Sequence, residues 1–268
     1  MMFQYKSYAK INRFLNVLDK REDNYHNIQS LFQLINFYDV ITFKKRNDNK
    51  IIIKSNIKNL EKKNIIYDVV SLIKDESSYK EFGLDIAIQK NIPLGSGLGG
   101  GSSNAATTFL AINNIFKIGM TKKKLLKLAS KVGSDVPFFL KHDNCWVEGR
   151  GNILTNIYIS KCFFILALSQ EVVSSSKMYR SLRSNRRIVN TSYEDFLNGN
   201  IENSFKTSVL KSYSSIRKLN DILSKFGTVH LSGSGGTLFV CEKDEQQANE
   251  ILSKLPQNYN FKLVSSLY

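Results

Sequence analysis

The segment from Gly95 to Ser103 places five glycines within nine residues, directly before an apolar pattern typical of a helix. Glycine allows positive φ angles and has no Cβ to hinder the close approach of an anion. The first turn of a helix carries unpaired N–H groups and a positive partial charge, so the arrangement suits the phosphates of a nucleotide. A close-packed strand-to-helix turn uses glycines in the same way, and this alternative stays open.

This glycine loop is not a P-loop, because GxxxxGK[ST] requires a lysine and the segment contains no cation. It also fits a dinucleotide-binding fingerprint poorly. The hydroxyl groups of Ser102 and Ser103 are candidates for binding a phosphate or Mg²⁺.

The elements around the loop follow from periodicity. Leu84, Ile86 and Ile88 alternate with other residues, which predicts a half-buried strand leading into the loop. A helix is expected after the loop. Its apolar face is formed by Ala105, Ala106, Phe109, Leu110 and Phe116.

A second helix is expected to begin at Thr121 and to end at Gly133 in a left-handed cap. The residues predicted to be buried on it are Leu125, Leu128, Ala129 and Val132. The next four residues, 134–137, are predicted to form a loop. Considered without the other motifs, Asp135 in this loop is interpreted as a turn or cap residue.

The C-terminal part repeats the mixture of strands and helices. Short strands at 228–231 and 237–241 flank a second glycine turn, Ser232–Gly236, and a last helix begins near Asp244. Its predicted buried stripe is Ala248, Ile251, Leu252 and Leu255. The fold class is therefore α+β, with a boundary placed between residues 157 and 158.

Composition narrows the function classes. Lys and Arg number 38 against 23 Asp and Glu, a net charge of +15, but the cations are dispersed, which favours a general bias in residue usage over nucleic-acid binding. The longest apolar run, Cys162–Leu168, is too short to span a membrane and predicts a buried strand. No signal peptide is recognised, and three cysteines without CxxC spacing favour reduced thiols and a cytoplasmic location.

The loop pattern from Pro93 to Ser103 resembles that of the small-molecule kinases grouped as galactokinase, homoserine kinase, mevalonate kinase and phosphomevalonate kinase. Five blocks, spread over nearly the whole chain, resemble one branch of this superfamily more closely, the 4-diphosphocytidyl-2-C-methyl-D-erythritol kinases. These blocks are Ala9–Asn12, Asp23–His26, Gly97–Ala105, Gly133–Phe138 and Ser232–Gly235.

The resemblance implies an ATP- and Mg²⁺-dependent kinase that phosphorylates the 2-hydroxyl of 4-diphosphocytidyl-2-C-methyl-D-erythritol in non-mevalonate isoprenoid synthesis. It implies a two-domain α+β fold, with a ribosomal-S5-like nucleotide-binding half (1–157) and a ferredoxin-like substrate-side half (158–268). The expected partner is thus a small-molecule substrate, with no membrane involved. The Mg²⁺ ligands and the oligomeric state do not follow from the sequence.

The matching positions for chemistry are Asp135, as general base, and Lys10, which orients Asp135 and stabilises the attacking oxygen and the γ-phosphate. Taken alone, Lys10 reads as a surface lysine in an apolar strand. Substrate binding is carried over to Asn12, Tyr25, His26 and Tyr179. ATP binding is carried over to Pro93, Leu94, Gly95, Ser96, Gly97, Leu98, Gly99, Gly100, Gly101, Ser102, Ser103 and Asn64.

Some positions depart from the family pattern. Asn24 stands where Gly is usual, a mild change because Asn tolerates a left-handed backbone. Arg13 stands where Leu is usual, and we expect it to reach solvent or to face the phosphates. Two other functions remain as alternatives, namely another kinase of the superfamily, such as homoserine or mevalonate kinase, and a basic nucleic-acid-binding protein with a kinase-like fold.

Overall fold

The structure is a computed structural model that describes residues 1–182 and 188–268. It divides into two compact units built from non-contiguous segments. The first unit contains residues 1–9, 37–92 and 99–142, and the second contains residues 10–36, 93–98 and 143–268. The long strands β1 (Met2–Lys20) and β2 (His26–Arg46) contribute residues to both units. The linear boundary between residues 157 and 158 stays a prediction.

The first unit contains a sheet in which β4 (Gly83–Gln89) lies between β3 (Ile51–Ser55) and the C-terminal part of β2. β3 runs parallel to β4, and β2 runs antiparallel to it. In this register Ile86 pairs with Phe43 on one side and Ile53 on the other, and all three side chains are buried. The alternation along β4 confirms the strand predicted at 84–88.

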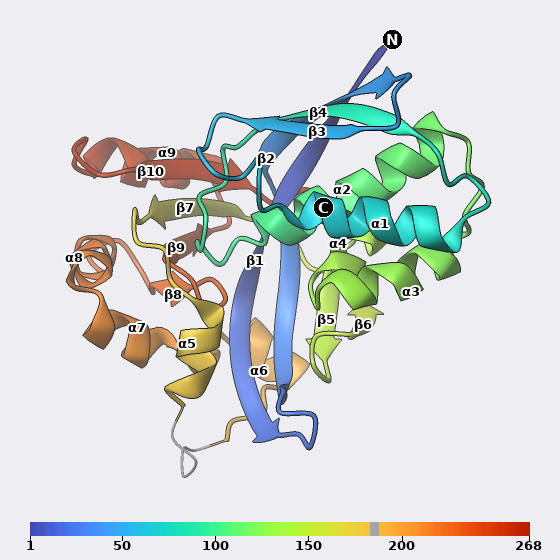
Figure 1. The fold of residues 1–268 in the computed structure, drawn as a ribbon. Helices are drawn as coiled ribbons and strands as arrows, with labels where there is room; N and C mark the ends of the chain where they lie inside the picture. Colours follow the sequence, from blue (N-terminus) through green and yellow to red (C-terminus); the bar gives the residue numbers. More distant parts are fainter. Residues whose placement is uncertain (183–187) are drawn as a thin grey trace. The chain divides into compact units, whose positions relative to one another are not determined.

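Helices cover one side of β3 and β4 in the first unit (Figure 1). The helix after the glycine loop is confirmed, but Leu110, predicted to be buried, is 43% exposed and is not among the buried residues of this helix. Val132 on the next helix is only half-buried. The helices of this unit are α1 (Ile65–Glu76), α2 (Gly100–Ile115), α3 (Lys122–Val132) and α4 (Val136–Lys141).

The end of α3 differs from the prediction. Thr121 caps its beginning as expected, accepting a hydrogen bond from Lys124 N. Gly133, however, has a φ of −178°, which is extended rather than left-handed backbone. The predicted loop at 134–137 is also wrong in part, because α4 begins at Val136. Pro137 lies in its first turn, where the missing N–H breaks no helical hydrogen bond.

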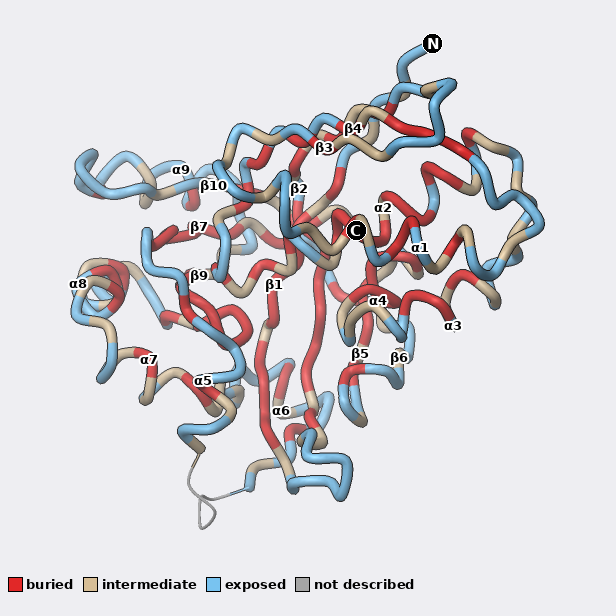
Figure 2. Tube along the Cα trace, viewed as in Figure 1, coloured by how far each residue is buried: buried red, intermediate tan, exposed pale blue. Residues whose placement is uncertain are grey.

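The second unit contains an antiparallel sheet in the order β10-β7-β9-β8. The apolar run predicted as a buried strand forms β7, which is deeply buried along its length (Figure 2). The rings of Phe164 on β7 and Phe239 on β9 pack edge to face at a centroid distance of 5.8 Å. The strands are β7 (Phe163–Leu168), β8 (His230–Leu231), β9 (Thr237–Glu242) and β10 (Phe261–Ser265).

The second unit also contains two further strands, which extend the sheet from the N-terminal part of β2. The last helix begins as predicted, since the Asp244 side chain accepts a hydrogen bond from Gln247 N. Of its predicted stripe, Ala248 and Leu255 are buried, while Ile251 and Leu252 are half-buried. The remaining elements are β5 (Cys145–Glu148), β6 (Ile153–Asn156), α5 (Ser175–Arg180), α6 (Tyr193–Leu197), α7 (Lys206–Ser212), α8 (Ser214–Leu223) and α9 (Glu245–Lys254).

The mixture of helices and sheets confirms the α+β class. The three cysteines, Cys145, Cys162 and Cys241, are free thiols, as predicted. No helix in the described part of the chain combines the length and the apolar character that crossing a membrane requires.

Candidate active site

The first half of the glycine loop, residues 95–98, belongs to the second unit and lies directly against the turn between β8 and β9. Gly97 has a φ of +82°, and a Cβ on it would lie 2.0 Å from the carbonyl oxygen of Ser232. The Ser232 hydroxyl donates a hydrogen bond of 3.1 Å to Gly97 O, and Thr237 N donates one of 3.0 Å to Ser96 O. Gly97 therefore serves the close approach of two backbone segments, a role that the sequence pattern did not separate from anion binding.

The second half of the loop begins α2 in the first unit. Gly99 is the N-cap residue and has a left-handed conformation, with φ 72° and ψ 18°. The first turn of α2 contains no acidic residue and has no side-chain cap. Gly101 is exposed, and a Cβ there would meet nothing within 4 Å. The N-terminus of α2 thus combines accessible backbone with the positive end of the helix dipole, which favours binding of an anion.

The two serines of this turn differ. Ser102 is half-buried, whereas Ser103 is buried and its hydroxyl accepts a hydrogen bond of 2.8 Å from Ser7. Ser102 is therefore the more available hydroxyl for a phosphate or a metal ion, a distinction that the sequence did not make.

Lys10 lies on β1 in the second unit. It is buried, so the interpretation of Lys10 as a surface lysine is wrong. Its ammonium group donates a hydrogen bond to Asn12 Oδ1 and lies 4.3 Å from the centre of the Phe32 ring. Its backbone N–H donates a hydrogen bond of 3.0 Å to Leu98 O in the glycine loop. β1 thus brings Lys10 and Asn12 together beside the first half of the loop.

Asn12 is fixed by two further contacts in the same unit. Its side-chain amide donates to Ser30 Oγ at 2.9 Å, and its backbone N–H donates to Ser232 Oγ at 3.2 Å. Ser232 therefore contacts both β1 and the glycine loop, although the sequence predicted it only as part of a turn.

Asp135, the predicted base, stands at the N-cap position of α4 in the first unit and is half-buried. Its side chain makes no capping hydrogen bond, so the carboxylate is not used to begin the helix. Lys10 and Asp135 belong to different units, and their pairing stays a prediction.

Asn64, predicted to contact the adenine base, caps α1. Its Oδ1 accepts a hydrogen bond of 3.1 Å from Ile66 N, and its Nδ2 donates one of 3.1 Å to Leu60 O. Both polar atoms of the side chain thus hold the start of the helix, and the contact with the base stays a prediction.

The predicted cytidine-binding residues lie in the second unit. His26 stacks on Tyr179, with ring centroids 5.5 Å apart, and Tyr179 packs edge to face on Phe205 at 4.9 Å. Tyr25 is 54% exposed, and its ring lies 5.5 Å from the guanidinium of Arg150. The structure thus brings His26 and Tyr179 together and adds Phe205 and Arg150, for which the sequence held no signal.

The surroundings of Asn24 and Arg13 explain why these two residues can depart from the family pattern. Asn24 has a φ of 64°, the left-handed conformation that Asn tolerates. Arg13 is half-buried and donates a hydrogen bond of 2.9 Å to Gln33 Oε1. Its guanidinium lies 5.3 Å from the ring centres of both Phe164 and Phe196. Aromatic packing in the second unit, which the sequence did not predict, therefore holds this cation.

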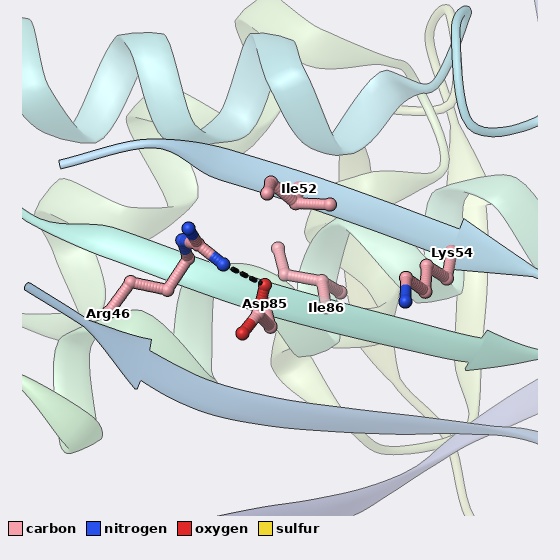
Figure 3. Close-up of a pocket in the computed structure, with 5 residues that line it drawn as sticks. All are labelled: Arg46, Ile52, Lys54, Asp85 and Ile86. Carbon is pink, nitrogen blue, oxygen red and sulfur yellow. Dashed lines mark hydrogen bonds and ion pairs between the residues drawn. The ribbon is translucent and has the colours of Figure 1, made fainter. Parts of the chain in front are cut away.

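A separate pocket of about 330 Å³ lies on the sheet of the first unit (Figure 3). An ion pair joins Arg46 and Asp85 beside it at 2.7 Å. None of the residues that line it is among the predicted site residues. The lining residues are Arg46, Ile52, Lys54, Asp85 and Ile86.

Comparison with known proteins places these features in a family. Residues 64–142 match the GHMP kinases N terminal domain, and residues 180–260 match the GHMP kinases C terminal domain. A crystal structure of 4-(cytidine 5'-diphospho)-2C-methyl-D-erythritol kinase has a TM-score of 0.84 at 24% identity and covers 98% of this chain and 99% of its own. For the mevalonate kinase of Methanococcus jannaschii the TM-score is 0.67 at 15% identity, covering 100% and 98%.

The fold and the two matched domains define the chain as a GHMP kinase, a phosphotransferase with a glycine-rich loop before a helix. A relative from Francisella philomiragia, named 4-diphosphocytidyl-2-C-methyl-D-erythritol kinase, is 33% identical over 270 residues, which cover 98% of this chain and 96% of the relative. One of the same name from Buchnera aphidicola is 32% identical and covers 100% and 94%. The chain belongs to the 4-diphosphocytidyl-2-C-methyl-D-erythritol kinase family.

Proposed function

We propose that this chain transfers the γ-phosphoryl group of ATP to the 2-hydroxyl of 4-diphosphocytidyl-2-C-methyl-D-erythritol. The observation that carries the proposal is the family relationship, 33% identity over 98% of the chain to a relative named for this substrate. The free cysteines support a cytoplasmic location, where thiols stay reduced.

In the proposed mechanism the loop binds ATP through backbone N–H groups at the start of α2, with Gly99 shaping the turn. The reaction needs positioning and neutralisation of charge more than covalent help from the protein. Lys10 is proposed to supply the cation that the loop lacks. Its burial strengthens its electrostatic effect on the γ-phosphate and on the attacking oxygen.

Asp135 is proposed to accept the proton of the substrate hydroxyl as that oxygen attacks the γ-phosphorus, while the bond to the β–γ bridging oxygen breaks and ADP leaves. A carboxylate oxygen is an acceptor of the kind that this role requires, and Asp135 stands half-buried at the N-cap position of α4. Asn12, held by Ser30, is proposed to contact the same substrate.

Mg²⁺ in kinases is held by the phosphates of the substrate and by one or two protein oxygens. In the first unit, the half-buried hydroxyl of Ser102 in the first turn of α2 is an oxygen donor of the required kind. We propose Ser102 as a protein ligand. When bound, the ion would neutralise charge on the phosphates.

The cytidine end is proposed to bind at Tyr25, His26 and Tyr179. Tyr25 presents an exposed aromatic face, and stacking of a base on such a face is favourable. The His26 ring is oriented by its stack on Tyr179, so its nitrogens have a fixed direction for hydrogen bonds to the polar edge of cytosine.

The test is an acceptor panel with purified protein, ATP and Mg²⁺, in which 4-diphosphocytidyl-2-C-methyl-D-erythritol, homoserine and mevalonate are offered separately. We expect ATP-dependent phosphorylation of the cytidyl compound alone. Phosphorylation of homoserine or mevalonate, with none of the cytidyl compound, would establish another kinase of the superfamily. Salt-sensitive RNA binding without turnover of ATP would instead favour the nucleic-acid alternative.

A further inference from the structure

A buried polar cluster in the first unit lies beside the glycine loop and has no role in the mechanism above. Lys90 and Asp39 form an ion pair in which both side chains are almost completely buried. Asn104, also buried, accepts a hydrogen bond of 3.1 Å from the Lys90 ammonium and donates one of 2.9 Å to Asp39 Oδ2. Removing two charges from water is costly, so such a pair needs full hydrogen bonding.

The Asp39 carboxylate also binds the backbone that enters the glycine loop. Its Oδ1 accepts hydrogen bonds from Asn91 N at 2.8 Å and from Ile92 N at 2.9 Å. These two residues directly precede Pro93 and Leu94, after which the glycine loop begins at Gly95. One carboxylate oxygen therefore fixes the direction in which the chain enters the loop.

The other side of the cluster holds the chain where it leaves the loop. Asn104 follows Ser103 on α2, and its amide also donates a hydrogen bond of 2.9 Å to Ser7 Oγ, which in turn donates to Ser103 Oγ. The Lys90 ammonium lies against Gly100, since a Cβ there would be 3.0 Å from its nitrogen. The entry and the exit of the loop are thus tied to the same carboxylate.

We propose that Asp39, Lys90 and Asn104 are positioning residues that hold both ends of the glycine loop, so that the N–H groups at the start of α2 are preorganised for the phosphates of ATP. This inference rests on the proposed function, because it assumes that the loop binds ATP. A buried ion pair by itself contributes little to stability relative to apolar side chains of similar volume, whereas its directed hydrogen bonds fix geometry.

The pairing also sets the charge beside the phosphate site. Lys90 and Asp39 neutralise each other, so this pair adds no net charge at the start of α2, where the helix dipole contributes a positive field. Loss of one partner alone would leave a buried charge and impair folding. The informative change therefore removes both charges together.

The test uses the full-length double variant Asp39→Leu/Lys90→Met, with Kd for a nonhydrolysable ATP analogue, KM for each substrate and Tm as readouts. The matched control is Arg46→Met/Asp85→Leu, which removes the half-exposed ion pair on the sheet of the same unit. We expect the cluster variant to raise Kd and KM for ATP about tenfold or more, with KM for the acceptor within about twofold. The control variant should leave both constants for ATP unchanged.

A folded cluster variant with the Kd and KM for ATP of the wild type overturns the proposal. Should the double variant fail to fold, Asn104→Ala keeps the ion pair and removes the link to Ser7, and it should raise Kd for the analogue about threefold or more. An unchanged Kd in that variant overturns the proposal as well. The two proposals fail separately. If the wild type binds the analogue but phosphorylates no cytidyl acceptor, only the proposed function is defeated, because the Kd for the analogue still reports whether the cluster positions the loop.

Discussion

The contact between Gly97 and the Ser232–Gly236 turn yields a quantitative prediction for Gly97→Ala. A residue with a Cβ at a φ of +82° costs about 1–2 kcal/mol, since the left-handed region is unfavourable for it. The new methyl group would also lie 2.0 Å from Ser232 O, and relief of such overpacking costs about 1–3 kcal/mol more. We therefore expect Gly97→Ala to lower the free energy of unfolding by about 2–5 kcal/mol.

Gly199 provides the matched control in the same unit. It has a φ of +76°, but a Cβ there meets nothing within 4 Å, so Gly199→Ala has only the conformational cost of about 1–2 kcal/mol. The assay is urea unfolding followed by the fluorescence of Trp146, the single tryptophan of the chain, which lies on β5 in this unit. If both alanine variants lose the same stability, the reasoning about the backbone contact is refuted.

Three further outcomes follow from the site. Asp135→Asn should lower kcat by about 10² or more and leave nucleotide Kd nearly unchanged, whereas comparable turnover removes the residue from the role of base. Tyr25→Ala should raise KM for the cytidyl substrate about three- to tenfold and spare KM for ATP, and equal effects on both would contradict a stacking role. Burial, with Arg13 and Lys206 nearby, lowers the pKa of His230 from 6.5 to about 4. Only the unfolded chain binds this proton between these pH values, so His230 alone should lower the free energy of unfolding of the wild type by about 2–3 kcal/mol as pH falls from 6.5 to 4. His230→Gln lacks this contribution and should lose correspondingly less in the same urea titration.

Much of the fold was predictable because its signals are local. The alternation of Leu84, Ile86 and Ile88 is a property of neighbouring residues, and so is the cap at Thr121, where the structure agrees with the sequence. Gly133 shows the limit of this reasoning. A glycine after an apolar run permits a left-handed cap but does not require one, and the chain instead extends there and begins α4 within three residues.

Some features of the candidate site were likewise predictable from local sequence, whereas others depend on tertiary contacts. The sequence alone determined that a glycine loop precedes a helix and that Lys10, Asp135 and the second glycine turn follow the pattern of one kinase family. Only the tertiary structure showed that Gly97 packs against the backbone of Ser232 and that the Ser103 hydroxyl is already hydrogen-bonded. It also showed that Asp39 accepts hydrogen bonds from the backbone that enters the loop. These contacts join residues far apart in sequence, such as Gly97 with Ser232 and Asp39 with Asn104. Periodicity and spacing describe one element at a time, so the partner of a buried polar group emerges only when the elements pack.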